Sequence, residues 1–175
     1  MNSFHESTLL TSNQQQRLNE RLGVTKNWKL VYRASQDGFG ARDFHKACDG
    51  KGENLGVIKS LNGSYLFGWW TPLSWSSHSS GEFVGDASTF IFTLTNPAGV
   101  PAKYTNKDSS RAIFNYIGDG PTLGYSDIAV PDKSNVTDAE TSFPRSYEDT
   151  TGRGDKTFTG NRNFIVSELE VFVRI

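Results

Sequence analysis

The C-terminal stretch Phe164-Ile-Val-Ser-Glu-Leu-Glu-Val-Phe-Val-Arg-Ile175 carries the clearest secondary-structure signal in the chain. Its apolar side chains recur at every second position, the period of a β-strand with one face in a core: Leu169, Val171, Val173 and Ile175. Glu168, Glu170 and Arg174 fall on the opposite face, which Phe172 interrupts. We therefore expect a strand whose second face is not wholly in water.

Similar signals recur upstream. The segments expected to be strands are 55–60, 64–70, 90–94, 111–117 and 123–130, together with a half-buried strand in which Trp28, Leu30 and Tyr32 alternate with Lys29 and Arg33. Asn62-Gly63 tolerates the positive φ angles of a tight hairpin, so the two strands beside it should pair antiparallel. Gly118-Asp-Gly-Pro121 is expected to be a turn.

Two helices are expected, both in the first third of the chain. Ser12 and Gln15 have the form of a capping box, which predicts an N-terminal helix at 12–23 with Leu18 and Leu22 on one face and Gly23 as its stop. A second helix is predicted at 41–48, with Gly50 ending it. The thin apolar stripe of the first helix should dock onto the sheet.

The segment from Asp132 to Asn163 reads as a long polar loop anchored by Phe143, Tyr147 and Phe158. Many short strands and few helices predict a mainly β (α+β) fold, a two-sheet antiparallel β-sandwich with two flanking helices. We expect a single domain over 1–175, with the sandwich at 28–175.

Composition narrows the classes of function. The 18 Lys and Arg residues nearly cancel the 19 Asp and Glu residues, so no bulk field attracts nucleic acid or anionic lipid. Apolar runs are too short to cross a bilayer, and the single cysteine with three scattered histidines offers no structural zinc spacing. We expect a cytoplasmic, monomeric chain with no metal or cofactor.

Catalytic motifs are missing from the sequence. It contains no G-x-S-x-G, H-E-x-x-H or G-x-x-x-x-G-K-[ST] motif. His45 and His78 lack an evident partner. Glu168 and Glu170 are two apart on one strand, and we interpret them as part of a solvated or salt-bridged face and not as a paired acid and base. We therefore predict no catalytic residues.

Three residues remain candidates for chemistry or binding. Cys48 is a candidate redox thiol, although its place on the apolar side of the last turn of its helix favours a buried, inert thiol. Trp69 and Trp70 must face opposite ways on a strand, so one belongs in the core and the other could contact a sugar or a protein.

Several stretches, taken in order, resemble the TLDc domain family. They are Trp28-Lys-Leu-Val-Tyr-Arg-Ala-Ser-Gln-Asp-Gly-Phe39, Phe44-His45, Cys48-Asp-Gly-Lys-Gly52, Val57-Ile-Lys-Ser60, Tyr65-Leu-Phe-Gly68, Trp75-Ser-Ser77, Phe90-Ile-Phe-Thr-Leu-Thr95, Gly120-Pro-Thr-Leu-Gly124 and Phe164-Ile-Val-Ser-Glu-Leu-Glu-Val-Phe172. The chain looks most similar to members from protists and other lower eukaryotes. It differs from animal members in Asp86-Ala-Ser-Thr89 and in the 132–163 segment.

The resemblance implies a two-sheet sandwich, a role in resistance to oxidative stress and, in several members, binding to the vacuolar proton-pumping ATPase. It brings no catalytic residue or cofactor. We therefore predict a non-catalytic protein-interaction domain, held at vacuolar or endosomal membranes only through a partner. The alternatives are an antioxidant protein using Cys48 and a carbohydrate-binding module using Trp69 or Trp70.

Overall fold

The computed structural model describes residues 3–23 and 25–175, so residues 1, 2 and 24 of the predicted 1–175 span lie outside the described residues. Within the described residues, twelve strands form two antiparallel sheets of six, which confirms the predicted two-sheet antiparallel fold. The first sheet has the order β1 (Trp28–Arg33), β12 (Val166–Arg174), β2 (Asn54–Ser60), β3 (Leu66–Thr71), β5 (Phe90–Thr93) and β6 (Lys103–Thr105). The second has the order β11 (Asn163–Phe164), β10 (Ala139–Glu140), β9 (Ile128–Pro131), β8 (Asp119–Leu123), β7 (Ile113–Asn115) and β4 (Glu82–Val84).

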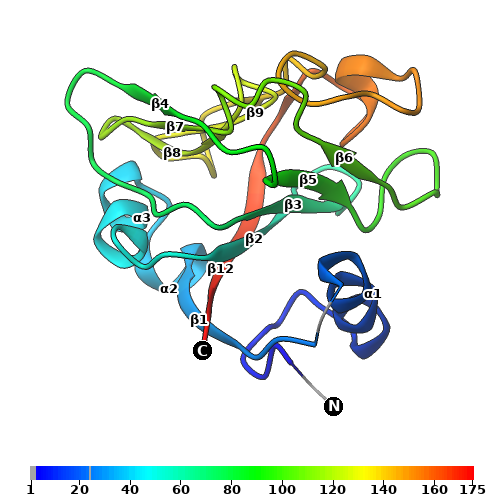
Figure 1. Cartoon of the computed structure of the whole chain (residues 1–175), viewed down its shortest axis with the longest axis horizontal. Coiled ribbons are helices and arrows are strands. Elements are labelled where there is room, and N and C mark those ends of the chain that lie inside the picture. Colours follow the sequence, from blue (N-terminus) through cyan, green and yellow to red (C-terminus); the bar gives the residue numbers. More distant parts are fainter. Residues whose placement is uncertain (1–2, 24) are drawn as a thin grey trace.

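The sheets stack as two layers, and the helix α1 (Ser12–Leu22) lies on the far side of the first sheet (Figure 1). Between the sheets is a core that includes Trp69, Tyr104, Tyr147 and Leu169, all buried. A second apolar cluster covers the outer face of the first sheet, where α1 contributes Leu18. The N-terminal helix therefore docks onto the sheet with its thin apolar stripe.

The start of α1 differs from the prediction by one residue. Thr11, not Ser12, is the N-cap: its hydroxyl accepts from the backbone N–H of Gln14, and the Gln14 side chain accepts from the backbone N–H of Thr11 at 3.0 Å. Gly23 ends the helix in the left-handed conformation, as expected. Either Ser12 or Thr11 satisfies the capping pattern, because each is followed three residues later by a glutamine.

Strand β1 contains a bulge that the alternating pattern does not reveal. Its register with β12 shifts between Leu30 and Tyr32. Trp28 and Leu30 therefore pack on the outer face of the first sheet, whereas Tyr32 lies in the core between the sheets. The prediction that these three side chains share one face was wrong.

The expected strand over 123–130 is also wrong, because the chain reverses within it. β8 and β9 form a hairpin around Gly124, which has φ 61°, and Ser126, which has φ 62°. The carboxylate of Asp127 fixes the reversal by accepting backbone N–H bonds from 145–147 at 2.7 to 3.2 Å. The predicted turn at Gly118–Pro121 is confirmed only in part: Gly118 lies in the turn between β7 and β8, whereas residues 119–121 already belong to β8.

Two shorter helices complete the described fold. α2 (Ala34–Asp37) is a single turn that the sequence did not predict, and α3 (Ala41–Cys48) occupies the residues predicted to be helical. α3 inserts Phe44 and Cys48 into the core between the sheets. The 132–163 segment holds β10 and the short 3₁₀ helix η1 (Gly154–Lys156), and its three predicted anchors are all buried.

Candidate functional site

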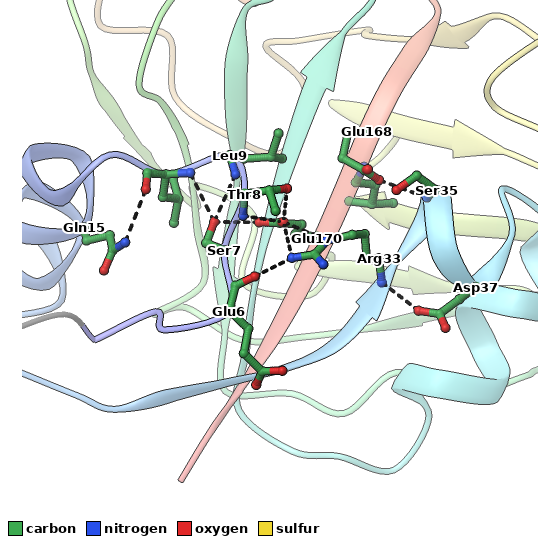
Figure 2. A network of polar contacts seen from close by, with 12 residues as sticks. Glu6, Ser7, Thr8, Leu9, Gln15, Arg33, Ser35, Asp37, Glu168 and Glu170 are labelled. Carbon is green, nitrogen blue, oxygen red and sulfur yellow. Dashed lines mark hydrogen bonds and ion pairs between the residues drawn. The ribbon is translucent and has the colours of Figure 1, made fainter.

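The most highly connected polar group is the carboxylate of Glu170, which is 0% exposed. Its Oε1 accepts from Arg33 Nε at 3.1 Å and Nη2 at 2.9 Å, and from the backbone N–H and hydroxyl of Thr8, both at 2.9 Å. Its Oε2 accepts from the Ser7 hydroxyl at 2.6 Å. Figure 2 shows these bonds converging from the N-terminal segment and β1 onto β12, where Arg33 also donates to the Glu6 carbonyl.

This network fastens the N-terminal segment to the sandwich. Both oxygens of Glu170 are occupied by donors, so the carboxylate is a structural acceptor and is not placed to move a proton to or from a substrate. Glu168, its neighbour on the strand, accepts the backbone N–H of Ser35 at 3.1 Å (Figure 2). The prediction of a salt-bridged face is thus confirmed at Glu170, which is paired with Arg33 and buried, whereas the solvated alternative does not apply to it.

His45 is buried beneath the turn that joins β7 to β8. Its Nδ1 lies 2.7 Å from Asp49 Oδ1, and its Nε2 lies 2.9 Å from the Tyr116 carbonyl oxygen and 3.0 Å from that of Asp119. Carbonyl oxygens only accept, so Nε2 carries a hydrogen and donates to both. Ser77 donates to the other oxygen of Asp49 at 2.6 Å. The serine is thus bonded to the aspartate and not to the histidine, which is not the order of a nucleophile and its base.

Cys48 lies in the core between the sheets, with 2% of its surface exposed. Burial raises the pKa of its thiol well above the usual range, and the nearby charges of Asp49 and Asp37 add to that effect. Both factors disfavour the thiolate, which is the reactive form of cysteine.

Trp69 and Trp70 point to opposite sides of β3. Trp69 is buried between the sheets, where its indole N–H and that of Trp75 both donate to Asn54 Oδ1, at 2.9 and 3.0 Å. Trp70 is half-buried on the outer side, with its indole N–H bonded to Glu53 at 2.9 Å and the Lys26 ammonium 5.2 Å from its ring centre. Its contacts are thus already taken by neighbours of its own chain.

The outer face of the second sheet is different, because its side chains have few such partners. Strand pairing sets one row of residues across this face: Phe83, Phe114, Thr122, Ala129, Glu140 and Asn163. Small side chains in the middle of the row lie between an aromatic ring on one side and a carboxylate on the other. The molecular surface is therefore depressed at the centre of this row.

A groove of about 250 Å³ occupies this low centre. We call it the β8–β9 groove, and its lining residues are Phe114, Asp119, Thr122, Ser126, Ala129, Val130, Pro131, Asp138 and Glu140. Three of them carry carboxylates and none carries a basic group. Burial raises the pKa of Asp119, and nearby Asp132 raises it further, whereas His45 opposes the shift.

Beside the groove lies a cluster of aromatic and arginine side chains. Phe83 packs against Phe114 with ring centres 4.8 Å apart and stacks on Tyr125 at 5.7 Å. Arg111 lies 5.4 Å from the centre of the Phe83 ring, and Arg145 lies 5.0 Å from that of Tyr125, which is 48% exposed. The second sheet therefore presents an acidic half and a basic, aromatic half side by side.

The sequence alone pointed to none of these surface residues as a candidate. The prediction of one strand over 123–130 concealed the hairpin that sets Thr122 beside Ala129, and with it the floor of the groove. The available signal was Gly124-Tyr-Ser-Asp127, whose residue types are typical of a reversal.

Within residues 3–23 and 25–175, no group of three or more His, Cys, Asp or Glu side chains has the geometry to hold a metal ion. In the same described part of the chain, no helix has both the length and the apolar character that crossing a membrane requires.

The chain belongs to the TLDc domain family, whose sequence profile matches residues 3–174 of 175. The match includes the N-terminal segment that Glu170 fastens as well as both sheets. No curated protein sequence matches the chain significantly. Membership of the family is consistent with a function related to oxidation resistance.

Proposed function

We propose that this chain is a non-catalytic protein-interaction domain that acts in resistance to oxidative stress. The observation that carries the proposal is the match to the TLDc domain family over residues 3–174. The geometry supports it in two ways. The buried polar groups at Glu170 and His45 are engaged in bonds that hold the fold, and the outer face of the second sheet offers aromatic and charged groups to a partner.

The partner we propose is the vacuolar proton-pumping ATPase, which would hold the chain at vacuolar or endosomal membranes from the cytoplasmic side. Interfaces favour aromatic and arginine side chains, and the cluster around Phe83 and Tyr125 supplies both. The domain would bind as one unit over 1–175 and as a monomer.

Binding of the purified chain to the purified pump tests this proposal, with ATP hydrolysis recorded in parallel. We expect saturable binding and a change in the fraction of assembled pump. Tyr125→Ala should weaken binding, whereas Val100→Ala, at a 64% exposed position of the β5–β6 loop, should not. A pump that neither binds the chain nor changes its assembly contradicts the choice of partner.

The redox alternative centred on Cys48 makes a separate prediction. A thiol that is buried and has a raised pKa should react slowly with peroxide. Mass spectrometry of the folded chain after peroxide treatment measures this, and rapid oxidation of Cys48 would favour an antioxidant enzyme. For the carbohydrate alternative, a change in tryptophan fluorescence on a glycan panel would have to come from Trp70, because Trp69 is buried.

A further inference from the structure

The size of the β8–β9 groove limits what can occupy it. Small-molecule sites in proteins typically measure about 300–1,000 Å³. At about 250 Å³, open to solvent, the groove is below this range and suits a single side chain of a larger partner.

The chemistry of the walls selects the kind of side chain. Phe114 presents an aromatic ring, and Asp119, Asp138 and Glu140 supply negative charge. Among the described residues, no ion pair or side-chain hydrogen bond is made by the carboxylate of Asp119 or that of Asp138. Glu140 has only Arg162, at 3.8 Å, in a contact between two exposed side chains. Such a contact contributes little, so the negative charge of the groove is nearly uncompensated.

The backbone of Asp119 is held in place by the buried side chain of His45. The Nε2 hydrogen of His45 bonds the backbone carbonyls on both sides of the Gly118 turn, at 2.9 and 3.0 Å. Partial burial leaves the charge of Asp119 poorly solvated and, with Asp132 nearby, raises the pKa of this carboxyl, although His45 opposes the shift. A cation in the groove would stabilise that charge.

We propose that the β8–β9 groove is a docking site for an arginine side chain of a partner protein. This deepens, and rests on, the proposed interaction function. A guanidinium group can stack on the Phe114 ring and pair with a carboxylate in the same pose, which an ammonium group does less well. Arg145 on the neighbouring half, together with Arg111, which is itself paired with Asp108, disfavours a run of basic residues. The recognised segment should therefore carry a single arginine with an acidic residue close to it in sequence.

The test uses a short peptide with blocked ends, acetyl-Gly-Arg-Gly-Glu-amide, titrated into the whole isotopically labelled chain and followed by NMR. The matched probe replaces arginine by citrulline, which keeps the shape and removes the charge. We expect saturable shifts of the Thr122 and Ala129 amides with the arginine peptide only. Asp119→Asn and Glu140→Gln should each weaken binding about two- to fivefold, as expected for a partly exposed ion pair.

The control variant is Glu20→Gln, which removes a carboxylate from the exposed side of α1 and should leave the peptide affinity unchanged. Equal shifts with both probes, or no shifts at Thr122 and Ala129, would overturn the proposal. A chain that dimerises in sedimentation, and loses the dimer in Arg111→Gln, would also overturn it, because a second copy would then fill the groove.

The failure of this inference can be separated from failure of the proposed function. If the pump binds the Asp119→Asn/Glu140→Gln variant as tightly as the original chain, the groove is not the docking site and the interaction function stands. If the arginine peptide binds in the groove but the pump does not bind at all, the groove is a docking site for a different partner.

Discussion

At the scale of single residues, Glu170 shows how the chain accommodates a buried charge. Its side chain is out of water, yet five donors from three residues surround it: Ser7, Thr8 and Arg33. Burying an ion pair costs desolvation energy, and the added hydrogen bonds offset that cost. The result is a fixed attachment between two ends of the chain, since Thr8 and Glu170 are 162 residues apart.

Replacing Glu170 by glutamine should therefore be costly. The change leaves the Arg33 guanidinium, 11% exposed, without its counter-charge, and removing one partner of a buried pair typically costs about 3–5 kcal/mol. Urea unfolding at pH 7 measures this loss. Glu168→Gln is the matched control, because that carboxylate accepts only backbone N–H groups and should cost about 1 kcal/mol or less. Equal losses for both variants would contradict this account.

Glu53 should give a stability difference that depends on pH. Its burial acts to raise its pKa, but bonds from Lys26, Trp70 and Arg174 outweigh burial and lower the pKa below the ordinary value of 4.5. A lowered pKa means that the unfolded state takes up the proton first, so the contribution of Glu53 is complete above about pH 4.5 and is lost as pH falls through the folded pKa. Thermal unfolding of Glu53→Gln and the original chain should differ at pH 7, and the difference should shrink as the pH falls below about 4.5. A gap that stays constant over this range would show that the charge of Glu53 is not what stabilises the fold.

At the scale of elements, the sequence predicts strands and helices better than it predicts which way their side chains face. The β2–β3 hairpin follows from Asn62-Gly63, and α3 follows from its apolar spacing. The bulge in β1 could not be predicted from the sequence, because a strand with a bulge contains the same residue types as a regular strand. The bulge nevertheless turns every side chain beyond it to the opposite face of the sheet. The groove was missed for a related reason: it depends on register between β7, β8 and β9, which is a property of paired strands and not of any one of them.

Gly56 in β2 gives an element-scale prediction. A Cβ atom there would lie 2.1 Å from the Trp69 ring, and that ring is held by its bond to Asn54 and by edge-on packing against Trp75. Gly56→Ala should therefore cost about 1–3 kcal/mol, even though alanine suits a strand no worse than glycine. Replacing Trp69 by leucine removes the obstacle, so the double variant should lose less than the sum of the two single losses. Additive losses in a urea double-mutant cycle would rule out the steric explanation.

At the scale of the whole molecule, the first sheet is shared by two apolar layers. Its inner face forms the core against the second sheet, and its outer face is covered by α1 and the segment that precedes it (Figure 1). β12 contributes to both layers, with Val171 on the inner side and Phe172 on the outer. Damage to the outer layer should therefore be transmitted to the whole sandwich and not be confined to the N-terminal segment.

Phe4→Ala tests this coupling. Phe4 is fully buried, stacked on Trp28 with ring centres 5.6 Å apart and edge-on to Phe172 at 5.1 Å. Truncating a buried phenylalanine typically costs about 3–5 kcal/mol. We expect one cooperative urea transition at lower denaturant, with tryptophan fluorescence and far-UV circular dichroism coinciding. Leu61→Ala, at a 58% exposed position, is the control and should leave the midpoint nearly unchanged. If instead part of the tryptophan fluorescence changes first and the far-UV circular dichroism transition keeps its midpoint, the N-terminal segment unfolds by itself and the two layers are not coupled.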